Sequence, residues 1–332
     1  MGRDSRSAFY KETMVAFEML YWLNFLTAAV HAASGLVVFA KAFDMKPITS
    51  THEDEAIGPY LPAVCFKSRR SNGIPDYFFV QPQMEWELKA YTATLVTLFF
   101  LLSAVFQAVQ GSEKYAYRKR VESNGPNVLR YVEYSFSASI MMVCIATTLM
   151  IFDMFTHVLI FTCTFACMSM GLVSDCLRTN AQRLHLVLRK YPGIIEIQET
   201  IDKLNRLKWT THYMGWLALM KPYIFVLGVA YFRTVYRNWD CLQSLPANTP
   251  ATPAWVHTVV ISQFLLFSCF GLVQFFQFRA TPDGSKRMTE LEEIQENMRI
   301  GTTTEFSFIM LSLTAKLILG WVVAGNVLFV KT

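Results

Sequence analysis

Two ionisable residues lie inside long apolar stretches of this 332-residue chain. Lys316 is in "SLTAKLILGWVVAGNV" (312–327), and Glu133 is in "LRYVEYSFSASIMMVCIATTLM" (129–150). A charged side chain at the centre of a bilayer costs at least about 3 kcal/mol, so an isolated charge is unfavourable there. A cation and a carboxylate at similar depth are therefore expected to form an ion pair. The pair has two interpretations: a salt bridge that only joins two helices, or an amine that takes part in chemistry.

The depth of the two residues is consistent with pairing. At 1.5 Å of rise per residue, Glu133 lies about 10 Å into a helix that begins near residue 126. The Lys316 backbone lies about 20 Å into a helix that begins near residue 302. A lysine side chain leans toward the N-terminus of its helix, which brings its nitrogen closer to the level of the carboxylate. A buried lysine is also a nucleophile toward aldehydes, and a protonated Schiff base requires a carboxylate counter-ion nearby.

Three further polar residues accompany this pair. Glu305 precedes Lys316 by eleven residues, about three helical turns, and Ser312 precedes it by one turn, so both share its helix face. His31 occurs in the apolar segment "WLNFLTAAVHAAS". This histidine is either a hydrogen-bonded packing residue or a proton acceptor. An acid, a hydroxyl and an imidazole near the lysine favour a role in proton transfer.

The elements that position these residues are membrane helices. The chain is 53% apolar and 17% charged, whereas soluble domains are about 25% charged. We therefore expect an all-α multi-pass membrane protein in which residues 1–332 form one domain. A span requires about 20 residues, and seven segments qualify, near 18–42, 88–110, 127–151, 155–177, 212–235, 255–279 and 303–330.

The distribution of basic residues predicts the orientation of this seven-transmembrane helix bundle. Most lysines and arginines fall in the segments on the N-terminal side, which places the N-terminus in the cytoplasm and the C-terminus outside. The formal net charge of +5 follows from this asymmetry and gives no indication of nucleic-acid binding. The expected partner is the lipid bilayer of the cell membrane.

The segments between the predicted spans carry weaker signals. Residues 43–87 form a long outer loop in which "YFFVQ" is a candidate strand of a short hairpin. Residues 178–211 have apolar residues at helical spacing, which fits an amphipathic helix on the membrane surface or, as we expect, an extension of the flanking helices beyond the membrane. Cys65 and Cys241 both fall in predicted outer loops and are candidates for a disulfide. The cysteines have no metal-ligand spacing, and no phosphate loop or nucleophile motif is present, so we expect neither a metal site nor an enzyme.

Seven helices, a lysine in the seventh and a carboxylate in the third are the components of a retinal protein. Several segments resemble the heliorhodopsin family. The third and seventh helices, "RYVEYSFSASIMMVCIA" (130–146) and "SLTAKLILGWVVAGNVL" (312–328), resemble the signatures of that family. "LNFLTAAVHAASG" (23–35) is similar to its first helix and "FLLFSCFGLVQFFQF" (264–278) to its sixth. The resemblance extends over all seven segments, and the inverted topology of the family agrees with the charge distribution.

The resemblance implies a function for individual residues. It implies all-trans retinal bound to Lys316, with Glu133 as the counter-ion and His31 in a polar cluster on the cytoplasmic side. It also implies a homodimer. The retinal pocket would be completed by residues of three helices, Ser137 and Met141 of the third, Tyr223 of the fifth, and Phe267 and Phe270 of the sixth.

One position departs from the family pattern. In "LLSAVFQAVQ" (101–110), Gln107 stands where the family commonly has a second histidine. A glutamine side chain does not take up a proton, so the cluster that would hold a released proton is altered. The proton-transfer candidates are therefore His31, Glu305, Ser312 and Gln107.

Three functions are compatible with these features. The first is a photoreceptor that signals to a partner of unknown identity. The second is a light-gated proton or cation channel, indicated by the altered histidine pair and by the row formed by Glu305, Ser312 and Lys316. The third is a seven-helix receptor without retinal. This last possibility is disfavoured because the chain lacks Asp-Arg-Tyr after the third helix and Asn-Pro-x-x-Tyr in the seventh.

Overall fold

The computed structural model describes residues 3–43, 65–71, 74–80, 88–149, 151, 153–191, 193–228, 231, 253–282 and 289–328. Within these residues the fold consists of long helices and one hairpin. The helices are α1 (Arg3–Phe43), α2 (Leu88–Ser112), α3 (Lys114–Glu122), α4 (Val128–Thr148), α5 (Met154–Lys190), α6 (Ile195–Lys221), α8 (Ala254–Ala280) and α9 (Glu290–Val323). Two π-helical stretches, η1 (Pro222–Gly228) and η3 (Ala324–Leu328), continue α6 and α9.

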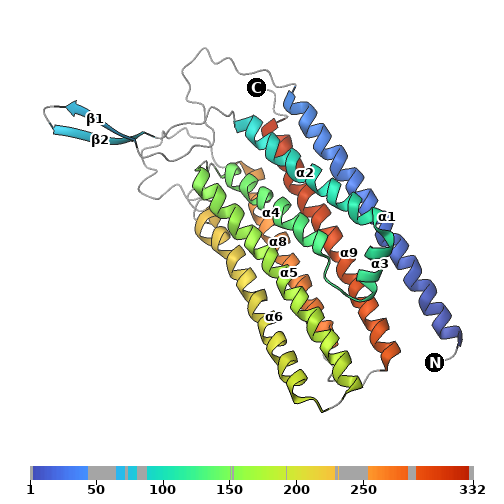
Figure 1. The fold of residues 1–332 in the computed structure, drawn as a ribbon. Coiled ribbons are helices and arrows are strands. Elements are labelled where there is room, and N and C mark those ends of the chain that lie inside the picture. The colour runs from blue at the N-terminus through green and yellow to red at the C-terminus, as the bar shows by residue number, and fades with distance from the viewer. Residues whose placement is uncertain are drawn as a thin grey trace.

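The long helices lie side by side as a bundle (Figure 1). Helix α1 begins at the same end as α9, and these two helices run in the same direction, so α9 finishes at the opposite end. We call the end at which α1 and α9 begin the inner end, because the sequence predicts that it faces the cytoplasm. Close contacts join α1 to α2, α4 to both α2 and α5, α5 to α6, and α8 to α9.

Six helices of the described chain are long and apolar enough to cross a membrane. They are α1, α2, α4, α5, α8 and α9, and they correspond to six of the seven predicted segments. The remaining segment, 212–235, falls on the second half of α6, on η1 and on residues outside the described ranges. The chain is therefore a multi-pass integral membrane protein.

Several helices are longer than the apolar segments that predicted them. Helix α5 continues to Lys190 and α6 begins at Ile195, so the segment 178–211 extends two helices, as predicted. Helix α9 begins at Glu290, before the predicted start at residue 303. Its early start has a local cause, a capping box in which the Thr289 side chain accepts from the Glu292 N–H while the Glu292 carboxylate accepts from the Thr289 N–H.

Two elements lie between the predicted spans. Helix α3 was missed because only Tyr117 and Val121 of its nine residues are buried, which gives too short an apolar pattern to detect. The expected hairpin is confirmed: β1 (Cys65–Ser71) pairs with β2 (Ile74–Val80), with Cys65 opposite Val80. The predicted partner of Cys65, Cys241, lies outside the described residues.

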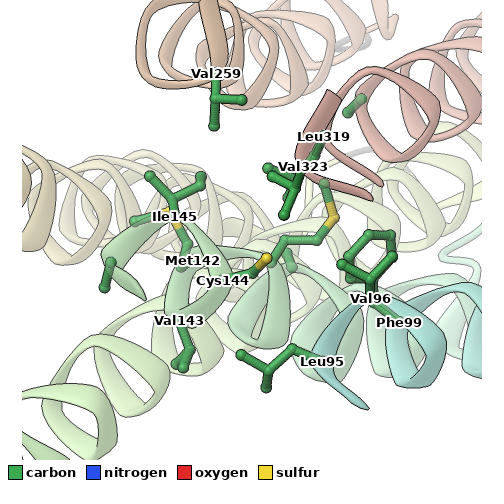
Figure 2. Close-up of a cluster of buried hydrophobic side chains, with 14 of the residues drawn as sticks. Leu95, Val96, Phe99, Met142, Val143, Cys144, Ile145, Val259, Leu319 and Val323 are labelled. Carbon is green, nitrogen blue, oxygen red and sulfur yellow. The ribbon is translucent and has the colours of Figure 1, made fainter. Parts of the chain in front are cut away.

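Helix α4 is at the centre of the bundle and is buried on all sides over much of its length. Figure 2 shows Met142, Val143, Cys144 and Ile145 of this helix among side chains from α2, α8 and α9. Four consecutive buried residues cannot share one face of a helix, so α4 contacts neighbours in every direction. Two of its serines, Ser135 and Ser139, satisfy their hydroxyls within the helix; Ser139 Oγ donates to the Ser135 carbonyl at 2.6 Å.

Candidate functional site

The side chains of Lys316 and Glu133 meet in the interior of the bundle. Lys316 Nζ on α9 donates to Glu133 Oε1 on α4 at 2.6 Å. Lys316 also donates to Ser312 Oγ, one turn earlier on α9, at 2.8 Å. The lysine is 2% exposed and the glutamate 1%. The two residues that the sequence predicts to pair are thus in direct contact, and losing either would leave the other charge buried without its partner.

Tyr134 links this ion pair to the next turn of α9. The ring of Tyr134 lies 5.2 Å from Lys316 Nζ, within the range of a cation–π contact. Its hydroxyl donates to the carbonyl of Phe308 at 2.9 Å. The residue after Glu133 therefore contacts the lysine through its ring and fixes α4 against α9 through its hydroxyl.

A cavity opens beside the lysine. We call it the lysine cavity; it has about 260 Å³ of space between atoms, part of it open to the surroundings, and its walls include Lys316, Ser312, Ser137, Met141, Phe267 and Phe270. Within the described chain the Ser137 hydroxyl has no hydrogen-bond partner although the residue is fully buried. Four predicted pocket residues thus line this space. The fifth, Tyr223, lies behind Phe267 with their ring centres 6.3 Å apart.

A second cavity, between α5, α6 and α8, adjoins the lysine cavity. The space between atoms in this aromatic cavity is about 540 Å³, part of which is open to the surroundings. The two cavities share Tyr134, Met168, Phe267 and Phe270 as wall residues. The apolar space next to Lys316 therefore adjoins a second, larger apolar space.

A chain of hydrogen bonds forms the polar part of the aromatic cavity. Trp216 Nε1–H donates to His212 Nε2 at 3.1 Å. Because an indole nitrogen only donates, Nε2 is the acceptor, and the proton on Nδ1 faces Gln274 Oε1 at 3.2 Å. Gln274 Nε2 then donates to the Tyr131 hydroxyl at 2.8 Å and to the Gly171 carbonyl at 2.7 Å. His212 is therefore neutral in this arrangement, and the sequence reading did not identify it.

A second buried ion pair lies toward the inner end. Glu305 on α9 pairs with Arg130 on α4 and accepts from the Tyr117 hydroxyl of α3 at 3.2 Å. Burial raises the pKa of Tyr117, so this phenol stays protonated as a donor. Glu305 was predicted to serve Lys316 along one face of α9, but its contact is with Arg130. An arginine one turn before Glu133 inside an apolar segment was the signal for this pair.

Polar side chains surround the second ion pair. They form a cavity of about 270 Å³, which we call the inner polar cavity; its walls include Asn124, Arg130, Asp175, Gln277, Thr304 and Glu305. Arg178 closes one side by pairing with Asp175 at 2.6 Å and by donating to the Asn124 carbonyl. Asn124 adopts a positive φ of 47°, a conformation that asparagine tolerates better than most residues.

The remaining predicted polar residues, His31 and Gln107, lie between α1 and α2. Both are buried, with exposures of 0% and 2%. Gln107 is a neighbour of the imidazole, yet neither ring nitrogen of His31 has a hydrogen-bond partner among the described residues. The histidine packs against Phe100 with a ring separation of 5.8 Å. In the described part of the chain, no cluster of side chains suited to a metal ion is present.

These features fit a chromophore with an aldehyde end and a long apolar body. The amine, its carboxylate partner and a slot with mainly apolar walls converge at one point, and the unpartnered Ser137 hydroxyl faces the same space. We call the lysine cavity and the adjoining aromatic cavity together the aromatic slot. Fold and site together define a multi-pass helical membrane protein with a buried lysine–glutamate pair at one end of this slot.

Comparison with known proteins identifies the family. The heliorhodopsin family model matches residues 20–328, nearly the whole chain. This chain belongs to the heliorhodopsin family. Membership implies a retinal-binding, light-sensing rhodopsin. The search of curated proteins found no match.

Proposed function

We propose that this chain is a photoreceptor in which all-trans retinal is attached to Lys316 and Glu133 balances its charge. The observation that carries the proposal is the 2.6 Å contact between Lys316 Nζ and Glu133 Oε1 at the head of the aromatic slot. A structural salt bridge would need the contact but not the slot. Family membership adds the retinal itself.

Each residue of the site has a defined role in this proposal. Lys316 Nζ would hold the aldehyde end of retinal covalently, and Glu133 would neutralise the positive charge on that nitrogen. Bound retinal supplies absorption of visible light and a change of shape on isomerisation. Ser312 offers the nitrogen a second acceptor on α9. Ser137, Met141, Phe267 and Phe270 shape the space beside the polyene.

The proposal assigns signalling rather than a catalysed reaction to the chain. The arrangement of α4 and α9 favours this role, because the ion pair and the Tyr134–Phe308 hydrogen bond both connect these two helices. A change at Lys316 would therefore alter the contact between the central helix and the last helix. Assembly as a homodimer in the cell membrane and a separate signalling partner belong to the same proposal.

The test is the colour of the purified protein. Protein supplied with all-trans retinal should absorb visible light, and Lys316→Ala should be colourless because no amine remains in the slot. Lys208→Ala is the matched control: Lys208 is also largely buried, at 7% exposure, but it contacts Asn205 on α6 and does not line the slot. A Lys316→Ala protein that still forms the covalent pigment would refute the proposal.

A second candidate is a light-gated proton or cation channel. The observation that favours it is that Lys316 and Ser312 at the site lie on the same helix, α9, as Glu305 at the inner polar cavity. Patch-clamp recording under illumination separates the two functions. A photoreceptor without conductance gives no photocurrent in cells that express the pigment well, whereas a channel gives a current that Glu305→Gln reduces or reshapes.

A further inference from the structure

The two buried ion pairs are separated by aromatic side chains. On the inward side of α9, Lys316 and Ser312 belong to the first pair, and Glu305 belongs to the second. Phe308 lies between Glu305 and Ser312 along α9 and is only 5% exposed. Ile309 beside it packs on the α1 side with Phe17 and Leu20. The polar row on α9 is therefore interrupted by one apolar turn.

Phe308 and Tyr134 form a layer across this gap. Their ring centres are 6.4 Å apart, and the Tyr134 hydroxyl is bonded to the Phe308 carbonyl. Each ring contacts a different cation: Lys316 Nζ lies 5.2 Å from the Tyr134 ring, and the Arg130 guanidinium lies 5.1 Å from the Phe308 ring. The layer thus touches both ion pairs without joining them.

The inner polar cavity on the far side of this layer is suited to water. Its walls carry the Arg130–Glu305 ion pair, several amide groups, and Asp175, whose charge is balanced by Arg178 behind the wall. Gln277 Oε1 is buried without a hydrogen-bond partner among the described residues, although the side chain donates to Asn124. Buried water ordinarily satisfies such atoms where several polar groups converge. Phe308 is a wall residue of both this cavity and the aromatic cavity.

We propose that the inner polar cavity holds water and that the Phe308–Tyr134 layer keeps this water from the Lys316–Glu133 pair. Opening the layer gives the lysine nitrogen an aqueous path to the inner end of the bundle. Closing it isolates that nitrogen, so the layer sets how readily water and small solutes reach the site. The consequence for the pigment rests on the proposed function; the barrier itself belongs to the protein without retinal.

The first experiment uses purified retinal-free protein. Reductive methylation with formaldehyde and cyanoborohydride reports access to Lys316, read by mass spectrometry of the peptide that contains it. Phe308→Ala should raise the methylation rate at Lys316 by at least about tenfold, equivalent to about 1.4 kcal/mol of barrier. Phe99→Ala is the control, because Phe99 is also fully buried and packs near Gly320, one turn beyond the lysine on the outer side. It should leave the rate close to that of the unmodified sequence.

The second experiment uses the retinal-loaded protein in the dark. Hydroxylamine from solution cleaves an accessible imine, so the rate of bleaching should rise in Phe308→Ala and stay low in Phe99→Ala. Phe308→Leu keeps part of the bulk and should give an intermediate rate in both assays. If Phe308→Ala does not fold, Phe308→Leu decides the matter, and a rate equal to that of the unmodified sequence overturns the proposal.

The outcomes separate this inference from the proposed function. Equal rates in Phe308→Ala and Phe99→Ala, in a protein that forms pigment, overturn the barrier and leave the photoreceptor intact. If Phe308→Ala speeds methylation of Lys316 but the unmodified sequence forms no pigment with retinal, the barrier is supported and retinal attachment is refuted.

Discussion

At the level of single residues, the site depends on two acids that have different partners. Glu133 contacts Lys316, and Glu305 contacts Arg130 and Tyr117. Both acids lie in the interior, but only Glu133 faces the slot. This difference gives a direct way to distinguish a counter-ion from a structural carboxylate.

Replacement of Glu133 should change the colour of the pigment. A negative charge beside the imine nitrogen stabilises the ground state, in which the positive charge is localised there, so Glu133→Gln should shift the absorption band to the red. Glu305→Gln is the matched control and should shift the band much less, because Phe308 and Tyr134 lie between Glu305 and the lysine. Absorption spectra of the two purified variants make the comparison, and equal shifts would contradict the assignment.

Only some of the residue pairs in the interior are predictable from the sequence. The Lys316–Glu133 contact could be predicted because both charges lie deep in apolar segments, where each needs a partner. The partner of Glu305 was not anticipated, because its helix face also pointed toward Lys316. Only the packing of α4 against α9 decides which of the two cations it meets. The His212–Gln274 contact joins α6 to α8, and no periodicity within either helix indicates it.

At the level of helices, α6 and α8 are in contact where the Trp216 ring of α6 packs against Gly271 of α8. A Cβ added at Gly271 of α8 would lie 2.5 Å from Trp216 Cζ2 of α6. The Trp216 indole, which donates to His212, therefore occupies space that only a glycine at position 271 leaves free. This contact is one wall of the aromatic cavity.

The glycine contact predicts a specific loss of stability. Gly271→Ala should force Trp216 to move and should lower the stability of the protein by about 1–3 kcal/mol, the usual cost of overpacking. Gly215→Ala on α6 is the matched control, because the nearest atom to its added Cβ is 3.4 Å away. That change should be neutral or stabilising by up to about 1 kcal/mol through helix propensity. Thermal unfolding of both variants tests the prediction; a Gly271→Ala protein as stable as Gly215→Ala would contradict it.

The boundaries of the helices were less predictable than their existence. Apolar runs mark where a helix crosses a membrane, but α5, α6 and α9 continue in polar sequence beyond those runs. Capping supplies the missing signal at α9, where Thr289 and Glu292 fix the start. Helix α3 buries two side chains and packs against α9, a contact that its own short sequence does not indicate.

At the level of the whole molecule, the direction of the helices bears on the topology. The first and last candidate spans, α1 and α9, run the same way along the bundle (Figure 1). Such an arrangement needs an odd number of crossings. Six candidate spans are present in the described chain, and we propose α6 with η1 as the seventh, in line with the sequence prediction.

The charge distribution and this direction together predict where the termini lie. An epitope tag at the N-terminus should be detected by antibody only after the cells are permeabilised, since most basic residues lie at that end. A tag at the C-terminus should be detected on intact cells. Immunofluorescence of the two tagged proteins makes the measurement. Detection of both tags on intact cells would rule out an odd number of crossings.

The burial of α4 also bears on how the protein is made. This helix carries Arg130 and Glu133 and is the least apolar of the six candidate spans, so its transfer into lipid from the translocon is the least favourable of the six. Among the described residues, its charges are matched by Glu305 and Lys316 of α9, a helix that is synthesised much later than α4. During biogenesis, Arg130 and Glu133 must therefore be shielded from lipid by earlier helices or by the insertion machinery until α9 is synthesised and pairs with them.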